Sequence, residues 1–308
     1  MTEAPSILVI GEALIDIVEQ SDGARSGHVG GSPANVAVGL SRLGQEARLL
    51  TSFGGDAYGD QIQSHLDEAG VALVEGSRSS GATSTAEARL DSTGAATYTF
   101  DITWQLPVAP VIEPPLALHT GSIAAFLEPG ATHVRALLES WAPSASISFD
   151  PNIRPALVGD HDGALATVEQ FLTLSDVVKV SDEDLGWLYP DRSARDIARE
   201  WLSRGPAVIF VTLGAKGAFA ISAQAAIEIT SVPVTVVDTV GAGDAFMAGL
   251  IDGLVREGLL GADRREALQA IDAETLTRVG QHAATVARLT VAQAGAEPPT
   301  RAEVLAAS

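Results

Sequence analysis

The chain has 308 residues, 46% of them hydrophobic, which suffices for one large α/β domain with a sizeable core. Its formal net charge is −20 and no basic run occurs, so nucleic acids and anionic membranes are disfavoured as partners. Cysteine is absent, which excludes disulfides and thiolate metal sites. With no secretory leader and no apolar run long enough to span a membrane, we expect a cytoplasmic protein.

Along most of the chain, predicted strands alternate with predicted helices. Short apolar runs predict strands at residues 7–10, 47–53, 116–121, 146–149, 177–180 and 208–213, with a further pair at 218–222 and 226–230. Helical patterns occur at 34–43, 58–69, 132–141, 162–173 and 194–203. This alternation predicts a mostly parallel central sheet with helices on both faces, and ligands at the carboxyl ends of its strands.

Two parts of the chain depart from the alternation and predict a small second sheet. Residues 13–18 read as a strand directly after the first, and residues 83–90 and 95–100 flank the turn Ser92-Thr93-Gly94 as a hairpin. Together, residues 13–31 and 82–104 are expected to form a four-stranded lid over the ligand-binding edge of the central sheet. No linker divides the chain, so residues 1–308 are expected to form a single domain.

A glycine pair, Gly30 and Gly31, precedes the first predicted helix. Ser32 is the expected N-cap, Pro33 suits the first helical position, and Asn35 falls in the first turn. Upstream, Asp16 lies between Ile15 and Ile17 in a predicted strand. Its carboxylate therefore faces either solvent or a ligand hydroxyl.

The apolar run at residues 232–237 predicts a strand, followed by the turn Gly241-Ala242-Gly243 and a helix. Glycines allow close backbone approach to a ligand, and the free N–H groups at a helix N-terminus bind anions. Asp244 occupies the first turn of that helix. A carboxylate beside a phosphate is repelled, so its presence fits a base that deprotonates an attacking hydroxyl. The alternative is an acidic residue favoured only by the helix macrodipole.

Other common phosphate and metal motifs are missing. Residues 214–217 (GAKG) lack the Ser or Thr of a P-loop, and residues 241–246 (GAGDAF) lack the third glycine of a dinucleotide-binding turn. The six histidines are scattered, which disfavours a zinc site.

The heptapeptide at residues 238–244 (DTVGAGD) resembles the C-terminal signature of the ribokinase-like, phosphofructokinase-B type sugar kinases. Residues 30–44 (GGSPANVAVGLSRLG) resemble the N-terminal signature of the same family, and the two occur in the family's order. The resemblance covers essentially the whole chain. It implies the ribokinase-like fold and transfer of the γ-phosphoryl group of ATP to a primary hydroxyl of a small sugar, with Mg²⁺ held mainly by phosphates and water.

Residues 11–17 (GEALIDI) and 150–155 (DPNIRP) resemble fructokinases most, so fructose is the expected substrate. 2-Keto-3-deoxygluconate kinases share much of the pattern, and ribokinase is a further alternative. A non-catalytic sugar-sensing protein with the same fold is the alternative of another class. Because lids of this family often pair, the resemblance also allows a homodimer through the lid.

The resemblance assigns a role to each matching residue. Asp244 would be the general base, with Gly241, Ala242, Gly243 and Arg154 stabilising the transferring phosphoryl group. The sugar would be bound by Asp16, Gly30, Gly31, Asn35 and Asp244. The nucleotide would be bound by Lys179, Ser181, Thr212, Gly214, Lys216, Gly217 and Gly243. Without the family, Arg154 and Lys216 would each read as part of a surface loop or turn.

Several positions keep two readings. Asp238, Val240 and Gly295 match the segments whose carbonyl oxygens surround potassium in some members, whereas Asp238 alone would cap a turn. Asp184 stands where many members have Glu, so its role is open. Trp104 either covers a sugar face or packs between lid and body. His28 is expected near the lid edge and His282 near the adenine pocket.

Overall fold

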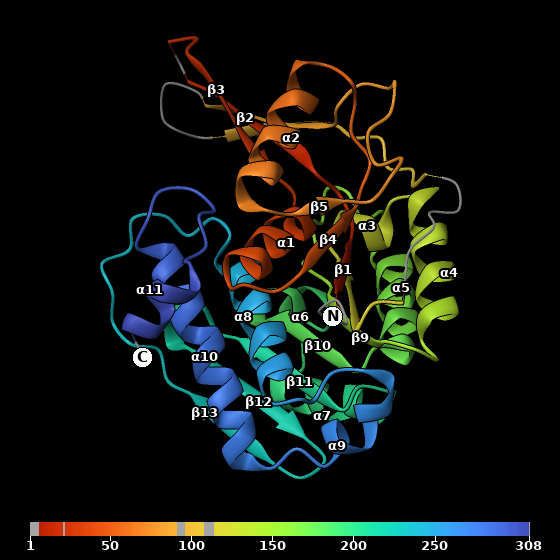
Figure 1. The fold of residues 1–308 in the computed structure, drawn as a ribbon, viewed down its shortest axis with the longest axis vertical. Helices are drawn as coiled ribbons and strands as arrows, with labels where there is room; N and C mark the ends of the chain where they lie inside the picture. Colours follow the sequence, from red (N-terminus) through yellow and green to blue (C-terminus); the bar gives the residue numbers. More distant parts are fainter. Residues whose placement is uncertain (1–5, 21, 91–95, 108–113, 308) are drawn as a thin grey trace, which may run out of the picture.

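The computed structural model describes residues 6–20, 22–90, 96–107 and 114–307 (Figure 1). Its body is a nine-stranded sheet in the order β13-β12-β11-β10-β9-β8-β1-β4-β5. From β5 through β4, β1, β8, β9 and β10 to β11, neighbouring strands run parallel, whereas β12 and β13 pair antiparallel at one edge. Their bounds are β1 (Ile7–Ile10), β4 (Ala47–Leu50), β5 (Ala72–Leu73), β8 (Ala117–Gly121), β9 (Ser146–Asp150), β10 (Val177–Ser181), β11 (Val208–Thr212), β12 (Ala218–Ser222) and β13 (Ala226–Ile229).

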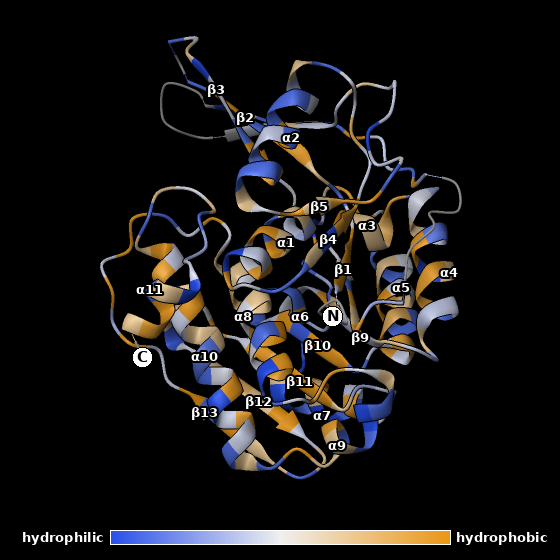
Figure 2. Ribbon diagram, viewed as in Figure 1, coloured by the Kyte–Doolittle hydropathy of each residue, from blue (hydrophilic) through white to orange (hydrophobic). Residues whose placement is uncertain are grey.

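Burial on both faces explains the continuous apolar runs of the central strands. In β1, Ile7 and Val9 belong to one core cluster, and Leu8 and Ile10 belong to the other. Figure 2 shows these strands as hydrophobic ribbons enclosed by helices. Helices α1 (Ser32–Arg42), α2 (Ala57–Ala69), α8 (Ala242–Arg256) and α10 (Ala273–Val291) contribute to the first cluster, and α4 (Gly130–Trp141), α5 (His161–Leu174), α6 (Asp182–Leu188) and α7 (Ala194–Leu202) contribute to the second.

Short helical segments complete the body. They are α3 (Ile123–Phe126), η1 (Gly214–Lys216), η2 (Ala262–Arg264), α9 (Arg265–Gln269) and α11 (Arg301–Ala306). Within the described ranges, no helix has both the length and the apolar character to cross a membrane.

A separate four-stranded sheet forms the lid, which lies at one end of the molecule in Figure 1. Its order is β3-β2-β6-β7, with β2 (Leu14–Glu19), β3 (Arg25–Gly30), β6 (Thr85–Leu90) and β7 (Ala96–Asp101). The register pairs Asp16 with His28 and Ala86, and Ala86 with Phe100, so these residues share one face. The predicted parallel sheet and lid are both confirmed, while the predicted turn at residues 92–94 lies outside the described residues.

Two local predictions are wrong. Residues 232–237 form no strand: Val232, Val236 and Val237 are 57%, 55% and 60% exposed, so this apolar run belongs to a loop. Ser32 is not the N-cap of α1, because Gly31 holds that position with φ 105° and no side-chain cap bond. The Ser32 hydroxyl is thereby free for another contact.

Candidate active site

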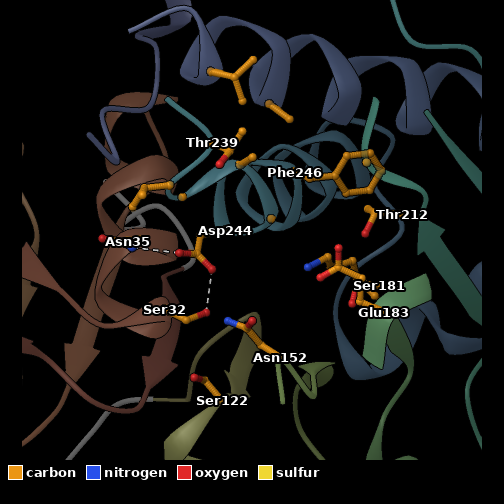
Figure 3. Close-up of a pocket in the computed structure, with 18 of the residues that line it drawn as sticks. Ser32, Asn35, Ser122, Asn152, Ser181, Glu183, Thr212, Thr239, Asp244 and Phe246 are labelled. Atoms are coloured by element: carbon orange, nitrogen blue, oxygen red, sulfur yellow. Dashed lines mark hydrogen bonds between the residues drawn. The ribbon is translucent and has the colours of Figure 1, made fainter. Parts of the chain in front are cut away.

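A cavity of about 960 Å³ lies between the carboxyl edge of the body sheet and the lid. From the lid, Leu14, Asp16, Ala86 and Phe100 line it. The body contributes residues at or just beyond the ends of β1, β8, β9, β10 and β11 and at the N-termini of α1 and α8. This is the edge at which open parallel sheets bind their ligands, as the sequence predicts. Figure 3 shows Asn35, Ser32 and Asp244 on one side of the cavity and Ser181, Glu183 and Thr212 on the other.

Asp244 is held in place by two donors from α1. It is 8% exposed, in the first turn of α8. One carboxylate oxygen accepts a 2.6 Å hydrogen bond from the Ser32 hydroxyl, and the other accepts a 2.8 Å bond from the Asn35 side-chain amide (Figure 3). Hydrogen bonds to a carboxylate are strong and directional, so they fix its position. Sequence reasoning missed this role of Ser32, which it interpreted as a helix cap.

The turn before Asp244 is closely approached by neighbouring atoms at two glycines. Gly241 has φ 74°, and a Cβ there would lie 2.6 Å from the Cβ of Ala296. A Cβ on Gly243 would lie 2.9 Å from the ammonium nitrogen of Lys179. The N–H of Ala242 donates a long bond, 3.3 Å, to the carbonyl of Thr239. The turn thus brings bare backbone to the cavity wall at the start of α8.

Lys179 lines the cavity wall next to this turn, although it is almost fully buried. Its ammonium lies 2.8 Å from Asp150, and the two side chains are 4% and 1% exposed. Burial raises the pKa of Asp150 to about 6, against the attraction of Lys179. Burial acts to lower the pKa of Lys179, but Asp150, with Asp244 and Asp184, outweighs it and the net shift is upward. The pair is therefore ionised at neutral pH.

Carboxylates also line the lid side of the cavity. Asp16 is exposed to the cavity, and a Cβ on Gly30 would overlap its carboxylate, so Gly30 leaves it room. Glu12, which sequence reasoning missed, is 3% exposed and accepts a 3.0 Å bond from the N–H of Ala124. Burial raises the pKa of Glu12 to about 7. Its only sequence signal is a carboxylate that follows Gly11 at the end of a buried strand.

Arg154 lies on the cavity wall beside these carboxylates. Its guanidinium donates a 2.7 Å bond to the side chain of Asn152, and its charge acts on Glu12 and Asp16. Asp184 is buried and accepts a 3.0 Å bond from the N–H of Ile153. It therefore ties the start of α6 to the loop that carries Arg154.

The remaining predicted nucleotide residues are mostly on the cavity wall. Ser181, Thr212, Gly214 and Gly217 line it, with Ser181 also capping α6, whereas Lys216 is exposed and is not among the lining residues. The assignment of Lys216 to the nucleotide therefore stays a prediction.

The structure shows the contacts of two positions that kept two readings, Asp238 and Trp104, and of His282. Asp238 accepts bonds of 3.0 Å from the N–H groups of Val240 and Gly295, so it does cap the turn. Trp104 is 1% exposed and donates to the carbonyl of Ala124 at 3.2 Å, so it packs in the core. His282 bonds to Asp252 at 2.7 Å and does not line the cavity.

Comparison with known proteins gives a consistent result. The model of the family described as "pfkB family carbohydrate kinase" matches residues 4–302. A fructokinase of Salmonella typhimurium is 35% identical over 266 residues, which cover 82% of this chain and 85% of the relative.

Solved structures extend the similarity to the fold. The fructokinase of Xylella fastidiosa with bound ATP superposes with a TM-score of 0.86 and 28% identity, covering 98% of this chain and 97% of that one. A double mutant of the fructokinase of Vibrio cholerae O395, bound to fructose, ADP and potassium ion, gives a TM-score of 0.81 and 26% identity over 100% and 99% of the two chains. The ribokinase-like fold predicted from the sequence is confirmed.

Proposed function

Because this chain belongs to the pfkB family of carbohydrate kinases, we propose that it transfers the γ-phosphoryl group of ATP to a primary hydroxyl of fructose. The observation that carries the proposal is the position of Asp244, fixed by Ser32 and Asn35 next to a glycine turn. Relatives named fructokinase, and a neighbour bound to fructose and ADP, support the choice of sugar.

In this proposal Asp244 accepts the proton of the sugar hydroxyl as that oxygen attacks the γ-phosphorus in line. The backbone N–H groups of Gly241, Ala242 and Gly243 stabilise the charge on the transferring group, and Arg154 assists from the cavity wall. Asp16, Gly30, Gly31 and Asn35 orient the other sugar hydroxyls. The lid excludes water, which would otherwise compete with the sugar for the phosphoryl group.

The nucleotide fits the other half of the cavity. Thr212, Gly214 and Gly217 offer a hydroxyl and open backbone there, and the exposed Val232 and Val236 supply an apolar wall for a base. An ATP-bound neighbour supports this assignment. Mg²⁺, held mainly by phosphate oxygens and water, would supply further neutralisation of the phosphate charge.

The charges around the sugar subsite favour a neutral substrate. Glu12, Asp16 and Asp244 present three carboxyl groups, and Arg154 is already engaged with Asn152 and attracted by two of them. A substrate carboxylate would be placed beside the carboxyl groups of Asp16 and Asp244, which disfavours 2-keto-3-deoxygluconate. Ribose is neutral and remains the stronger alternative. A sugar sensor has no need of a base at the glycine turn.

The deciding experiment is ADP release measured in a coupled assay with fructose, ribose and 2-keto-3-deoxygluconate. We expect the highest kcat/KM for fructose. A higher value for either other sugar would overturn the substrate assignment. If calorimetry shows that a sugar binds but none of the three sugars causes ADP release, a non-catalytic sugar-sensing protein would be favoured.

We also propose that a monovalent cation binds near the glycine turn, at carbonyl oxygens around Asp238, Val240 and Gly295. A neighbour with bound potassium supports the site. Because the Asp238 carboxylate is engaged in capping, its contribution would be to shape the loop. Replacing potassium by choline at constant ionic strength is expected to lower kcat, and an unchanged kcat would count against the site.

We also propose a homodimer, formed through the part of the lid that carries Tyr98. Tyr98 is 63% exposed and stacks on Phe100, with ring centroids 6.3 Å apart. Val18 and Ala88 share its face by register, which extends the cavity-facing side of the lid with apolar side chains. Sedimentation is expected to give a dimer that Tyr98→Glu dissociates. A monomeric wild-type protein would contradict this proposal.

A further inference from the structure

We propose that Lys179 is a buried, fixed positive charge that stabilises the transferring phosphoryl group beside the glycine turn, with Asp150 as its positioning residue. The inference rests on the proposed kinase function and changes the role of Lys179. Its ammonium, on the cavity wall next to the Gly243 backbone, acts on the phosphoryl group during transfer and contributes little to holding the nucleotide.

The geometry places the ammonium directly against that turn. Lys179 is the third residue of β10 and is 3% exposed. Its nitrogen lies 2.9 Å from the point that a Cβ on Gly243 would occupy, so no side chain separates it from the Gly243 backbone. The Asp150 carboxylate, 2.8 Å away, holds the ammonium in this position. The absence of a side chain at Gly243 therefore serves the approach of Lys179 as well as that of a ligand.

The other charged groups that act on Lys179 make its positive charge necessary. They are Asp150, Asp184 and Asp244, all carboxylates. His119 adds no charge, because burial, followed by the nearby Lys179, lowers its pKa to about 3. Without Lys179 a phosphoryl group entering the turn would therefore lie near these acidic side chains with no compensating lysine charge, in a chain with a net charge of −20. In a site shielded from water, such a fixed charge acts strongly.

The choice of residue type agrees with this role. Among the 19 basic residues only Lys179 and Lys216 are lysines, and all the others are arginines. An ammonium is a compact point charge, whereas a guanidinium is planar and larger. The close approach to Gly243 thus suits the compact ammonium better than the larger guanidinium.

A purely structural ion pair is the competing explanation. Buried ion pairs add little net stability, because desolvation offsets the attraction, but removing one partner is strongly destabilising. A neutral pair of similar size is therefore expected to restore stability. Only a catalytic role predicts that activity stays low when stability returns, and this difference defines the experiment.

The test compares Lys179→Met, the double variant Lys179→Met with Asp150→Asn, and Arg265→Met as a matched control. Arg265 forms an ion pair with Asp176 at 2.7 Å and does not line the cavity. For each protein, kcat and KM for fructose, the thermal midpoint, and the affinity for ADP with and without aluminium fluoride are measured. The ADP–aluminium fluoride complex imitates the phosphoryl group in transfer.

We expect Lys179→Met to lower kcat about 10- to 100-fold, below the roughly 10²–10³ measured for loss of a direct oxyanion donor. Affinity for ADP–aluminium fluoride should fall by a similar factor, with KM for fructose and affinity for ADP alone changed less than about threefold. The double variant should regain thermal stability but not kcat. Arg265→Met should lose stability and keep kcat.

Recovery of wild-type kcat in the double variant would overturn the inference, and so would an unchanged affinity for ADP–aluminium fluoride. If Lys179→Met alone does not fold, the double variant carries the test. A wild-type protein that releases no ADP with any sugar would contradict the proposed function. An active wild type whose lysine variants retain full kcat would contradict this inference alone.

Discussion

Replacing Gly31 by alanine is expected to destabilise the protein and weaken sugar binding together. Gly31 lies where the lid strand β3 meets α1, with φ 105°. A Cβ there would overlap the carbonyl oxygen of Glu12 and lie 3.1 Å from the Cα of Ala13. These are backbone atoms at the crossing from body to lid, so no change of rotamer relieves the overlap.

The expected magnitude follows from two costs. A non-glycine residue at positive φ costs about 1–3 kcal/mol, and overpacking a rigid site costs about 1–3 kcal/mol. The free energy of unfolding should therefore fall by about 2–6 kcal/mol out of a typical total of about 5–15 kcal/mol. Relief by a backbone shift would move the first turn of α1, so KM for fructose should rise, because Ser32 and Asn35 lie in that turn.

Gly23→Ala is the matched control. Gly23 also has positive φ, 86°, but a Cβ there meets nothing within 4 Å. It should therefore show only the conformational cost, about 1–3 kcal/mol. Urea unfolding of both variants, followed by circular dichroism, separates the two costs. Equal destabilisation by the two substitutions, or an unchanged KM in Gly31→Ala, would refute the reasoning.

Two further substitutions probe buried charge. The pKa of Glu12 is about 7 in the folded protein and 4.5 as a free side chain, so the folded state binds the proton more tightly and unfolding becomes easier as pH rises from about 4.5 to 7. Glu12→Gln should remove this decline and raise stability at pH 8 by about 3 kcal/mol, with little gain at pH 4.5. A parallel pH profile of unfolding in the two proteins would argue against it. Arg301→Met removes both bonds, of 2.9 and 2.6 Å, from Arg301 to the fully buried Asp252. Because Arg301 is 30% exposed, the loss of stability should be about 1–3 kcal/mol, less than for a fully buried pair. Since neither Arg301 nor Asp252 lines the cavity, kcat should stay within about twofold. A kcat loss matching that of an active-site variant would show that this ion pair positions α8 for catalysis.

The fold could be predicted because its central strands are buried on both faces and are separated by amphipathic helices. Local rules failed where tertiary context decides. The run at residues 232–237 is apolar enough for a strand, yet β13 forms the edge of the sheet and this run stays a loop on the cavity wall. Hydrophobicity alone does not distinguish a strand from a loop whose apolar side chains line a cavity.

In the candidate site, too, local patterns could be predicted and contacts between distant residues could not. Asp244 and its turn could be found because glycines followed by an acid at a helix start form a local pattern. Ser32 could not be assigned as its partner, because the two residues are 212 positions apart and meet only when α1 packs on α8. The position of Glu12 and the placement of Lys179 beside Gly243 likewise depend on contacts between separate strands and helices. Sequence patterns therefore indicated the chemistry, and the packing of the elements determined which side chains take part.

The most direct test of the proposed mechanism is the turnover of Asp244→Asn. Asparagine has nearly the same shape and can still accept a hydrogen bond from Asn35 and donate one to Ser32, so the pocket should be preserved. Its amide does not take up a proton. Since general-base catalysis contributes about 10²–10⁴ in rate, kcat with fructose should fall by at least about 10²-fold, while the calorimetric Kd for fructose changes little. A variant that phosphorylates fructose at a rate close to that of the wild type would contradict the assignment of Asp244 as the base.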